Sequence, residues 1–150
     1  MTTKPAGLIG TISNAWAPIT RLLDSLQSLA ALAARVYVAQ VFFLSGLTKL
    51  RNWGTTVALF TDEYKVPLLS PTAAAVLGTA GELVLPVLLV LGLAGRFSAI
   101  GLFVVNGVAV IALAEIAPAA LQQHILWGAL LAALAIYGMG AWSVDRWLKR

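Results

Sequence analysis

Four long stretches of the chain are almost entirely apolar, at about residues 29–50, 72–94, 97–116 and 121–142. A helix rises about 1.5 Å per residue, so about 20 residues are enough to cross the roughly 30 Å hydrocarbon layer of a membrane. Unpaired backbone groups are not tolerated in lipid, so each stretch is expected to be helical. The last two connections are only a few residues long, which makes neighbouring helices antiparallel. The pattern predicts an all-α integral membrane four-helix bundle.

The segment before the first span has a different pattern. In ITRLLDSLQSL, apolar residues recur every three or four positions, opposite the polar side chains of Arg21, Asp24 and Gln27. This period is typical of an amphipathic helix that lies on the membrane surface. We therefore divide the chain into an N-terminal cytoplasmic segment with this interfacial helix (1–28), the bundle (29–142) and a basic cytoplasmic tail (143–150).

The connection between the first and second spans is longer and mixes aromatic with polar residues. It reads RNWGTTVALFTDEYKVPLLSP. We expect a short interfacial helix or a partly re-entrant loop here, with Trp53 and Tyr64 at the level of the lipid headgroups.

Composition supports a membrane protein and excludes several kinds of chemistry. Hydrophobic residues make up 60% of the chain and charged residues only 11%, whereas roughly a quarter of an average soluble domain is charged. Cysteine is absent, which excludes disulfide exchange, thiolate nucleophiles and iron–sulfur clusters. One His and two Met are too few for paired haem ligands or a copper site, so we expect no metal centre.

The net charge of +4 comes from basic residues that stand mostly at the ends of apolar runs. Such residues indicate topology and contacts with lipid headgroups, so we expect the lipid bilayer as a partner and no nucleic acid. Lys4, Arg21, Arg96 and the basic C-terminal residues share one side if the N-terminus is cytoplasmic. This bias favours a multi-pass protein with both termini in the cytoplasm.

One carboxylate, Glu82, lies inside the otherwise uncharged second span. An ionised Glu in hydrocarbon is costly unless it is protonated, paired or next to water, so Glu82 is expected to face the bundle interior. Either Lys49 or Arg35 is within reach as a partner, and the sequence does not choose between them. His124 either caps the outer turn or serves with Glu82 in a proton relay, so these two residues are the candidate proton-handling groups.

The other candidates are polar or aromatic residues of the spans. Asn106 lies in the middle of the third span, and Phe42 and Trp127 are ring-bearing residues of the first and fourth spans. Arg35 and Arg96 are candidate members of structural ion pairs. Lys49 and Arg96 also fit charges that extend toward the headgroups and set topology.

Several of these residues fall in segments that resemble the DoxX family of small four-helix membrane proteins. The segments are FFLSGLTKL (42–50), GTAGELVLPVLLVLGLAGRFSAIGL (78–102) and GAWSVDR (140–146). The resemblance implies a four-helix bundle in a prokaryotic inner (plasma) membrane. It also implies an association with redox reactions. Some relatives are linked to thiosulfate:quinone oxidoreductase and terminal quinol oxidase complexes, and others to membrane complexes that defend against oxidants.

The leading functional hypothesis is a redox-associated subunit that binds quinone or docks a soluble oxidoreductase. A quinone head group needs hydrogen-bond donors, ring contacts and protonatable neighbours. Lys49 and Asn106 suit the donor role, and Phe42 and Trp127 suit the ring contacts. Glu82 and His124 suit the role of protonatable neighbours. No site for an electron donor is evident, so a protein partner in a membrane complex is expected, and whether the chain is itself an enzyme stays open. The alternatives are a non-enzymatic scaffold or assembly factor and a small proton-coupled transporter.

Overall fold

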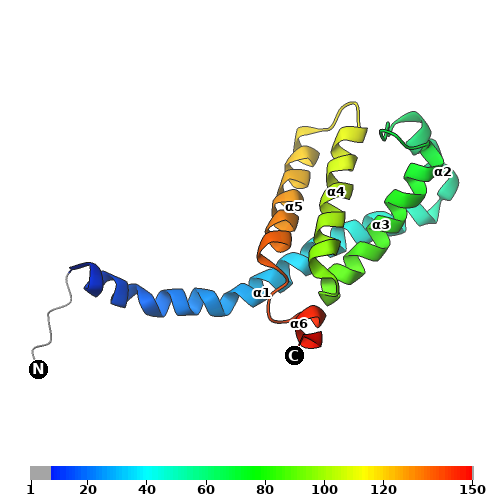
Figure 1. The fold of residues 1–150 in the computed structure, drawn as a ribbon. Helices are drawn as coiled ribbons and strands as arrows, with labels where there is room; N and C mark the ends of the chain where they lie inside the picture. Colours follow the sequence, from blue (N-terminus) through cyan, green and yellow to red (C-terminus); the bar gives the residue numbers. More distant parts are fainter. Residues whose placement is uncertain (1–7, 150) are drawn as a thin grey trace, which may run out of the picture.

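The computed structural model describes the backbone of residues 8–149 and the side chains of residues 15–149. Lys4, which entered the topology argument, and Arg150 lie outside the described residues. No strand occurs in the described part of the chain, which consists of helices α1 (Leu8–Arg51), α2 (Trp53–Asp62), α3 (Pro71–Leu91), α4 (Gly95–Ala112), α5 (Pro118–Tyr137) and α6 (Val144–Leu148) (Figure 1). Four of these, α1, α3, α4 and α5, are long and apolar enough to cross a membrane. The predicted all-α membrane bundle is confirmed.

Helix α1 joins the amphipathic segment to the first span without a break. It contains 44 residues, which corresponds to about 66 Å, roughly twice the hydrocarbon thickness. Its N-terminal part extends away from the other helices (Figure 1), and Trp16, Leu22 and Leu23 are exposed there. The backbone stays helical across residue 28 because SLAALAAR contains strong helix formers and no Gly or Pro.

The remaining spans end earlier than predicted, at residues that the helix cannot easily accommodate. Helix α3 begins at Pro71, with Ser70 as its N-cap. It ends before Gly92, whose φ of 66° lies in the left-handed region. Helix α5 ends before Gly138, with φ of 90°. The sequence had extended these spans to residues 94 and 142. Of the short helix and the re-entrant loop that the sequence left open between the first two spans, the structure has a helix, α2, and the Asn52 side chain accepts a hydrogen bond from the Thr55 amide at its start.

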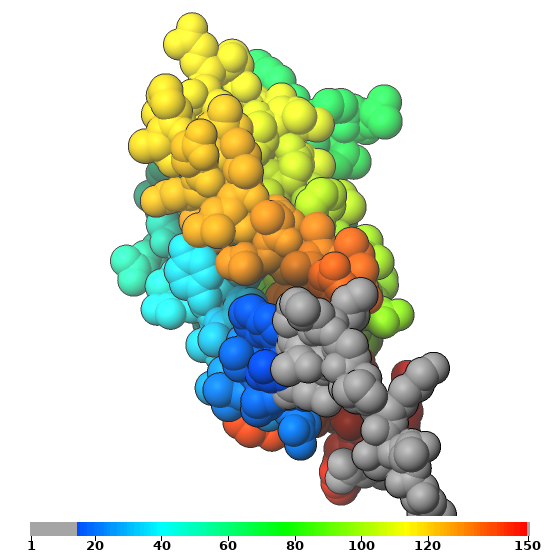
Figure 2. Space-filling view, turned by 90° about the vertical axis from the view of Figure 1, so that its left-hand side faces the viewer, coloured from blue at the N-terminus to red at the C-terminus, as the bar shows by residue number. Residues whose placement is uncertain are grey.

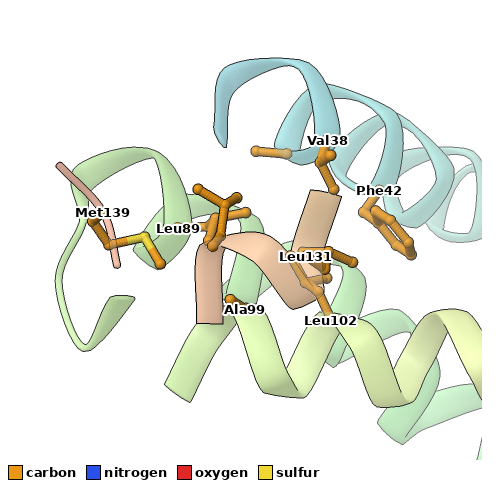
Figure 3. Close-up of a cluster of buried hydrophobic side chains, with 9 residues drawn as sticks. Val38, Phe42, Leu89, Ala99, Leu102, Leu131 and Met139 are labelled. Carbon is orange, nitrogen blue, oxygen red and sulfur yellow. The ribbon is translucent and has the colours of Figure 1, made fainter. Parts of the chain in front are cut away.

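Helices that follow one another in the chain pack against each other, and the last long helix also packs against the first. Helix α3 packs on α1 and α4, α4 packs on α5, and α5 returns to α1. On the face shown in Figure 2, α5 (orange) lies against the cyan part of α1. Figure 3 shows part of the apolar core, where Val38 and Phe42 of α1 face Leu131 of α5.

The C-terminal segment folds back onto the turn between α3 and α4. The Asp145 carboxylate accepts hydrogen bonds of 2.8 Å from the amides of both Ala94 and Gly95, at the start of α4. The Asp145 amide in turn donates to the Gly92 carbonyl at 3.0 Å. The bond from Gly95, with that from Ala94 and the charge of Lys149, holds the pKa of Asp145 below its ordinary value despite partial desolvation. Asp145 therefore supplies the cap that α4 lacks locally.

Candidate functional site

A buried ion pair joins the first two spans. Lys49 Nζ lies 2.5 Å from Glu82 Oε2, and Nζ also donates to Ser45 Oγ at 3.0 Å. The Lys49 and Glu82 side chains are only 20% and 10% exposed. Lys49 stands in the last turn of α1 and Glu82 in the middle of α3. Of the two cations that the sequence left open, Lys49 is the partner of Glu82.

The ion pair borders a cavity of about 410 Å³. Helices α1, α3, α4 and α5 contribute to its wall, together with α2 and the loop that follows it. The polar or amphipathic side chains on this wall are Ser45, Lys49, Tyr64, Glu82, His124 and Trp127. Most of the remaining wall is aliphatic or aromatic, so the charges of Lys49 and Glu82 lie at the edge of an apolar space.

The cavity extends to the outer surface of the bundle between α3 and α4. Leu77 of α3 and Val104 of α4 both line it, and they are 58% and 56% exposed. The upper ends of α3 and α4 diverge in Figure 1, with α1 crossing behind them. The cavity therefore reaches the apolar outer face of the bundle beside these two residues.

His124 is hydrogen-bonded to Asn106 through both its side chain and its backbone. The two side chains meet through His124 Nδ1 and Asn106 Oδ1, which are 2.8 Å apart, and Asn106 Nδ2 donates to the His124 backbone carbonyl at 2.9 Å. His124 borders both the cavity and a neighbouring groove between α4 and α5, whereas Asn106 borders only the groove. Asn106 therefore does not line the cavity itself and is connected to it through His124.

An aromatic row covers the α1–α5 side of the cavity. The Trp127 ring packs edge-on against Phe42 with centroids 5.9 Å apart and against His124 at 5.0 Å. Trp127 Nε1 donates to the Tyr37 hydroxyl at 3.4 Å. The structure thus brings together Lys49, Glu82, Phe42, Trp127 and His124, all of which the sequence had singled out.

The two arginines lie away from this site, and the ion pairs expected for them are not formed in the described part of the chain. Arg35 donates to the carbonyls of Met139 (2.7 Å), Trp142 (2.9 Å) and Val90. Arg96 donates to the Ile136 carbonyl at 3.3 Å. The physical reason is that helix C-termini leave carbonyls unpaired and attract positive charge, and a guanidinium with five N–H donors suits both needs.

Ser45, Phe60 and Tyr64 are among the residues of the cavity wall that sequence reasoning did not identify. Ser45 is one helical turn before Lys49, and this i, i+4 spacing is the signal in the sequence that places it beside Lys49. Tyr64 packs on Phe60 with centroids 5.1 Å apart, and the next amide, of Lys65, donates to the Ala112 carbonyl at 2.8 Å. Burial first, and then the charges of Glu63 and Glu82, raise the pKa of Tyr64. No local pattern shows that this loop folds inward.

The model of the DoxX family matches residues 30–115, which is more than half of the chain. The chain belongs to the DoxX family. The matched region includes the Lys49–Glu82 pair and Asn106, and it ends before His124 and Trp127. No curated protein and no solved structure matches the chain. Family and fold together make this DoxX protein a multi-pass membrane protein with four candidate spans.

The site of this DoxX protein offers hydrogen-bonding and proton-accepting groups rather than metal ligands. Of the described residues, no three His, Asp or Glu side chains gather where they could hold a metal ion. The ammonium of Lys49 has three N–H donors, of which Glu82 and Ser45 take two. The third donor, the carboxylate and the imidazole are the groups that can meet a molecule in the cavity.

Proposed function

We propose that this protein is a redox-associated subunit of a membrane complex and that its cavity binds the head group of a quinone. The observation that carries the proposal is a buried ion pair at the wall of an apolar cavity that extends to the lipid-facing surface. A quinone has this same combination of properties, because it joins a polar ring to a long apolar tail.

The dimensions and the wall of the cavity fit such a ligand. Its volume of about 410 Å³ lies in the range of roughly 300–1,000 Å³ that is usual for small-molecule sites. The spare N–H of Lys49 suits a ring oxygen, and Phe42 and Trp127 supply aromatic surface beside it. Leu77 and Val104 line the route that the tail would follow toward the lipid.

The ionisable residues have separate roles in this proposal. Glu82 holds the Lys49 ammonium in place through the short contact between them, and it is the carboxylate nearest to the bound ring. His124 is the second proton-accepting group on the wall. Asn106, Arg35 and Arg96 position other groups and do not meet the ligand.

The proposal includes a protein partner and an orientation in a prokaryotic inner membrane. The chain has no cysteine, and the cavity wall offers no group that carries electrons, so an oxidoreductase partner would deliver or remove them. Arg146 and Lys149 follow the last span at the end of the bundle where Arg35 and Arg96 lie. We place this end, and both termini, in the cytoplasm.

A non-enzymatic scaffold is the second candidate, and one observation favours it. The N-terminal part of α1 carries exposed apolar side chains, among them Trp16, Leu22 and Leu23, and extends beyond the other helices (Figure 1). Such a surface suits either the membrane interface or a helix of a partner protein. In a scaffold, substitution of Glu82 would reduce recovery of the complex and leave its turnover per complex unchanged.

Co-purified quinone tests the proposal directly. The protein is extracted with native lipid into nanodiscs, and quinone per protein is measured by organic extraction and mass spectrometry for the wild type, Glu82→Gln and Glu115→Gln. Glu115 is an exposed carboxylate outside the cavity, so it controls for loss of one negative charge. We expect enrichment over the lipid background in the wild type and Glu115→Gln, and loss of it in Glu82→Gln. Background levels in all three would overturn the proposal in favour of the scaffold.

A further inference from the structure

The carboxamide of Asn106 is held at both of its ends, and this determines which way it faces. Its nitrogen lies 2.9 Å from the backbone carbonyl of His124, an atom that only accepts hydrogen bonds. The amino group must therefore be on that side, and the carboxamide oxygen must face the imidazole. A flipped amide would place two acceptors against each other.

The orientation of the amide in turn determines the tautomer of His124. The carboxamide oxygen of Asn106 lies 2.8 Å from His124 Nδ1 and has no hydrogen to donate, so Nδ1 must carry the proton. A neutral imidazole has one N–H, which leaves Nε2 as a lone-pair acceptor. Among the described residues Nε2 has no hydrogen-bond partner. Because Nδ1 is bonded to Asn106, which does not line the cavity, Nε2 is the ring nitrogen left for a molecule in the cavity that His124 borders.

The packing of α4 against α5 makes room for this arrangement. A Cβ atom at Gly128 would lie 3.2 Å from Asn106 Nδ2, so a larger residue there would press on the amide. Asn106 itself is only 6% exposed. In that setting a lost hydrogen bond is not readily replaced by water.

We propose that Asn106 is a positioning residue that keeps His124 in the Nδ1–H tautomer, so that the cavity prefers a head group with a hydroxyl over one with only carbonyls. The identity of the ligand rests on the proposed function: a quinol would then bind more tightly than the matching quinone. A quinol hydroxyl donates to Nε2, whereas a quinone carbonyl opposite Nε2 leaves two acceptors facing each other. On the other side of the cavity the Lys49 ammonium can donate to a hydroxyl or to a carbonyl oxygen, whereas the Glu82 carboxylate can accept only from a hydroxyl.

The tautomer is measured first, without ligand. His124 is the only histidine of the chain, so ¹⁵N-histidine labelling in nanodiscs yields a single imidazole. Protonated and unprotonated ring nitrogens differ widely in ¹⁵N chemical shift. At a pH where the ring is neutral, we expect a proton on Nδ1 and none on Nε2. Asn106→Leu should shift the population toward the Nε2–H form that predominates in free histidine. Gly107→Ala is the control on the same helix, because no atom lies within 4 Å of a Cβ at this position.

The second measurement compares a short-chain ubiquinol with the matching ubiquinone, under anaerobic conditions, by quenching of tryptophan fluorescence in the same nanodiscs. We expect the quinol to bind at least about tenfold more tightly, the effect of one well-formed hydrogen bond to a buried partner. The preference should fall in Asn106→Leu and persist unchanged in Gly107→Ala. Gly128→Ala gives a milder perturbation of the same amide if Asn106→Leu does not fold.

The outcomes separate this inference from the function on which it rests. An Nε2–H tautomer in the wild type overturns the inference and leaves quinone binding to the co-purification experiment. The Nδ1–H tautomer with quinone bound as tightly as quinol overturns the selectivity. The Nδ1–H tautomer with neither form bound overturns the proposed ligand, and the selectivity with it.

Discussion

Replacing Lys49 with methionine removes the positive charge beside Glu82 and keeps a long, mostly apolar side chain in its place. The Lys49 and Glu82 side chains are 20% and 10% exposed, and their charged atoms are 2.5 Å apart. At this separation the Coulomb attraction is about 7 kcal/mol for an effective dielectric constant of about 20, and desolvation of both ions offsets most of it. The variant retains the desolvation of Glu82 without the compensating charge.

The expected loss follows from that imbalance. Removing one partner of a buried pair typically costs about 3–5 kcal/mol, and the partial exposure of Lys49 places this pair toward the lower end. Glu82→Gln should cost a similar amount, because it leaves the ammonium without its carboxylate. The double variant Lys49→Met/Glu82→Gln should cost little more than either single change. The coupling energy from the cycle should therefore be about 2–3 kcal/mol.

Unfolding in mixed micelles of increasing SDS content, followed by tryptophan fluorescence, measures the four free energies of unfolding. Glu115→Gln, which removes an exposed carboxylate, should change the free energy of unfolding by less than about 0.5 kcal/mol. Single-variant losses that add within about 0.5 kcal/mol in the double variant would show that the two residues act independently. That result would refute the ion pair as a unit of stability.

Two further predictions concern the opposite end of the bundle. Arg35→Met should lower the free energy of unfolding by at least about 3 kcal/mol, because three carbonyls lose their donor. Arg35→Lys should recover only part of this in the same SDS assay, and full recovery would contradict the carbonyl-binding role. Asp145→Asn should cost about 0.5–2 kcal/mol at neutral pH, through the weakened cap on α4. The folded-state pKa of Asp145 is depressed, so its contribution is present above the unfolded-state pKa and is lost as the pH falls through the folded-state pKa. The wild type should therefore lose more stability than Asp145→Asn between neutral and acidic pH, and parallel pH profiles would contradict this.

Burial of Glu82 was predictable because its cost in lipid is a local property. Any single helix that carries this residue has to turn it away from hydrocarbon, whichever helices surround it. The amphipathic segment around Arg21 and Asp24 was predictable for a different reason, because the period of its apolar residues is also a local property. The sequence did not predict that this segment and the first span form one continuous helix. The period of the apolar residues does not say whether the backbone breaks between two helical segments.

The partners of the polar side chains were not predictable. Lys49 and Arg35 are both basic residues of α1, and only the packing of α1 on α3 determines that Lys49 is the one beside Glu82. Arg35 meets carbonyls of residues 55 to 107 positions away, and such backbone acceptors have no signature in the sequence. Tyr64 entered the cavity wall through a loop whose contact with Ala112 is likewise non-local.

By itself, the sequence determined that this membrane protein has four helices able to cross the bilayer and that Glu82 turns inward, because transfer free energies and helical period act residue by residue along the chain. The tertiary structure alone decided that Lys49 is the partner of Glu82, that Asn106 orients His124, and that a cavity lies between them. Each of these depends on the tilt, rotation and depth of one helix against another. Those quantities are set by the sum of many small packing terms, and no short stretch of sequence contains that sum.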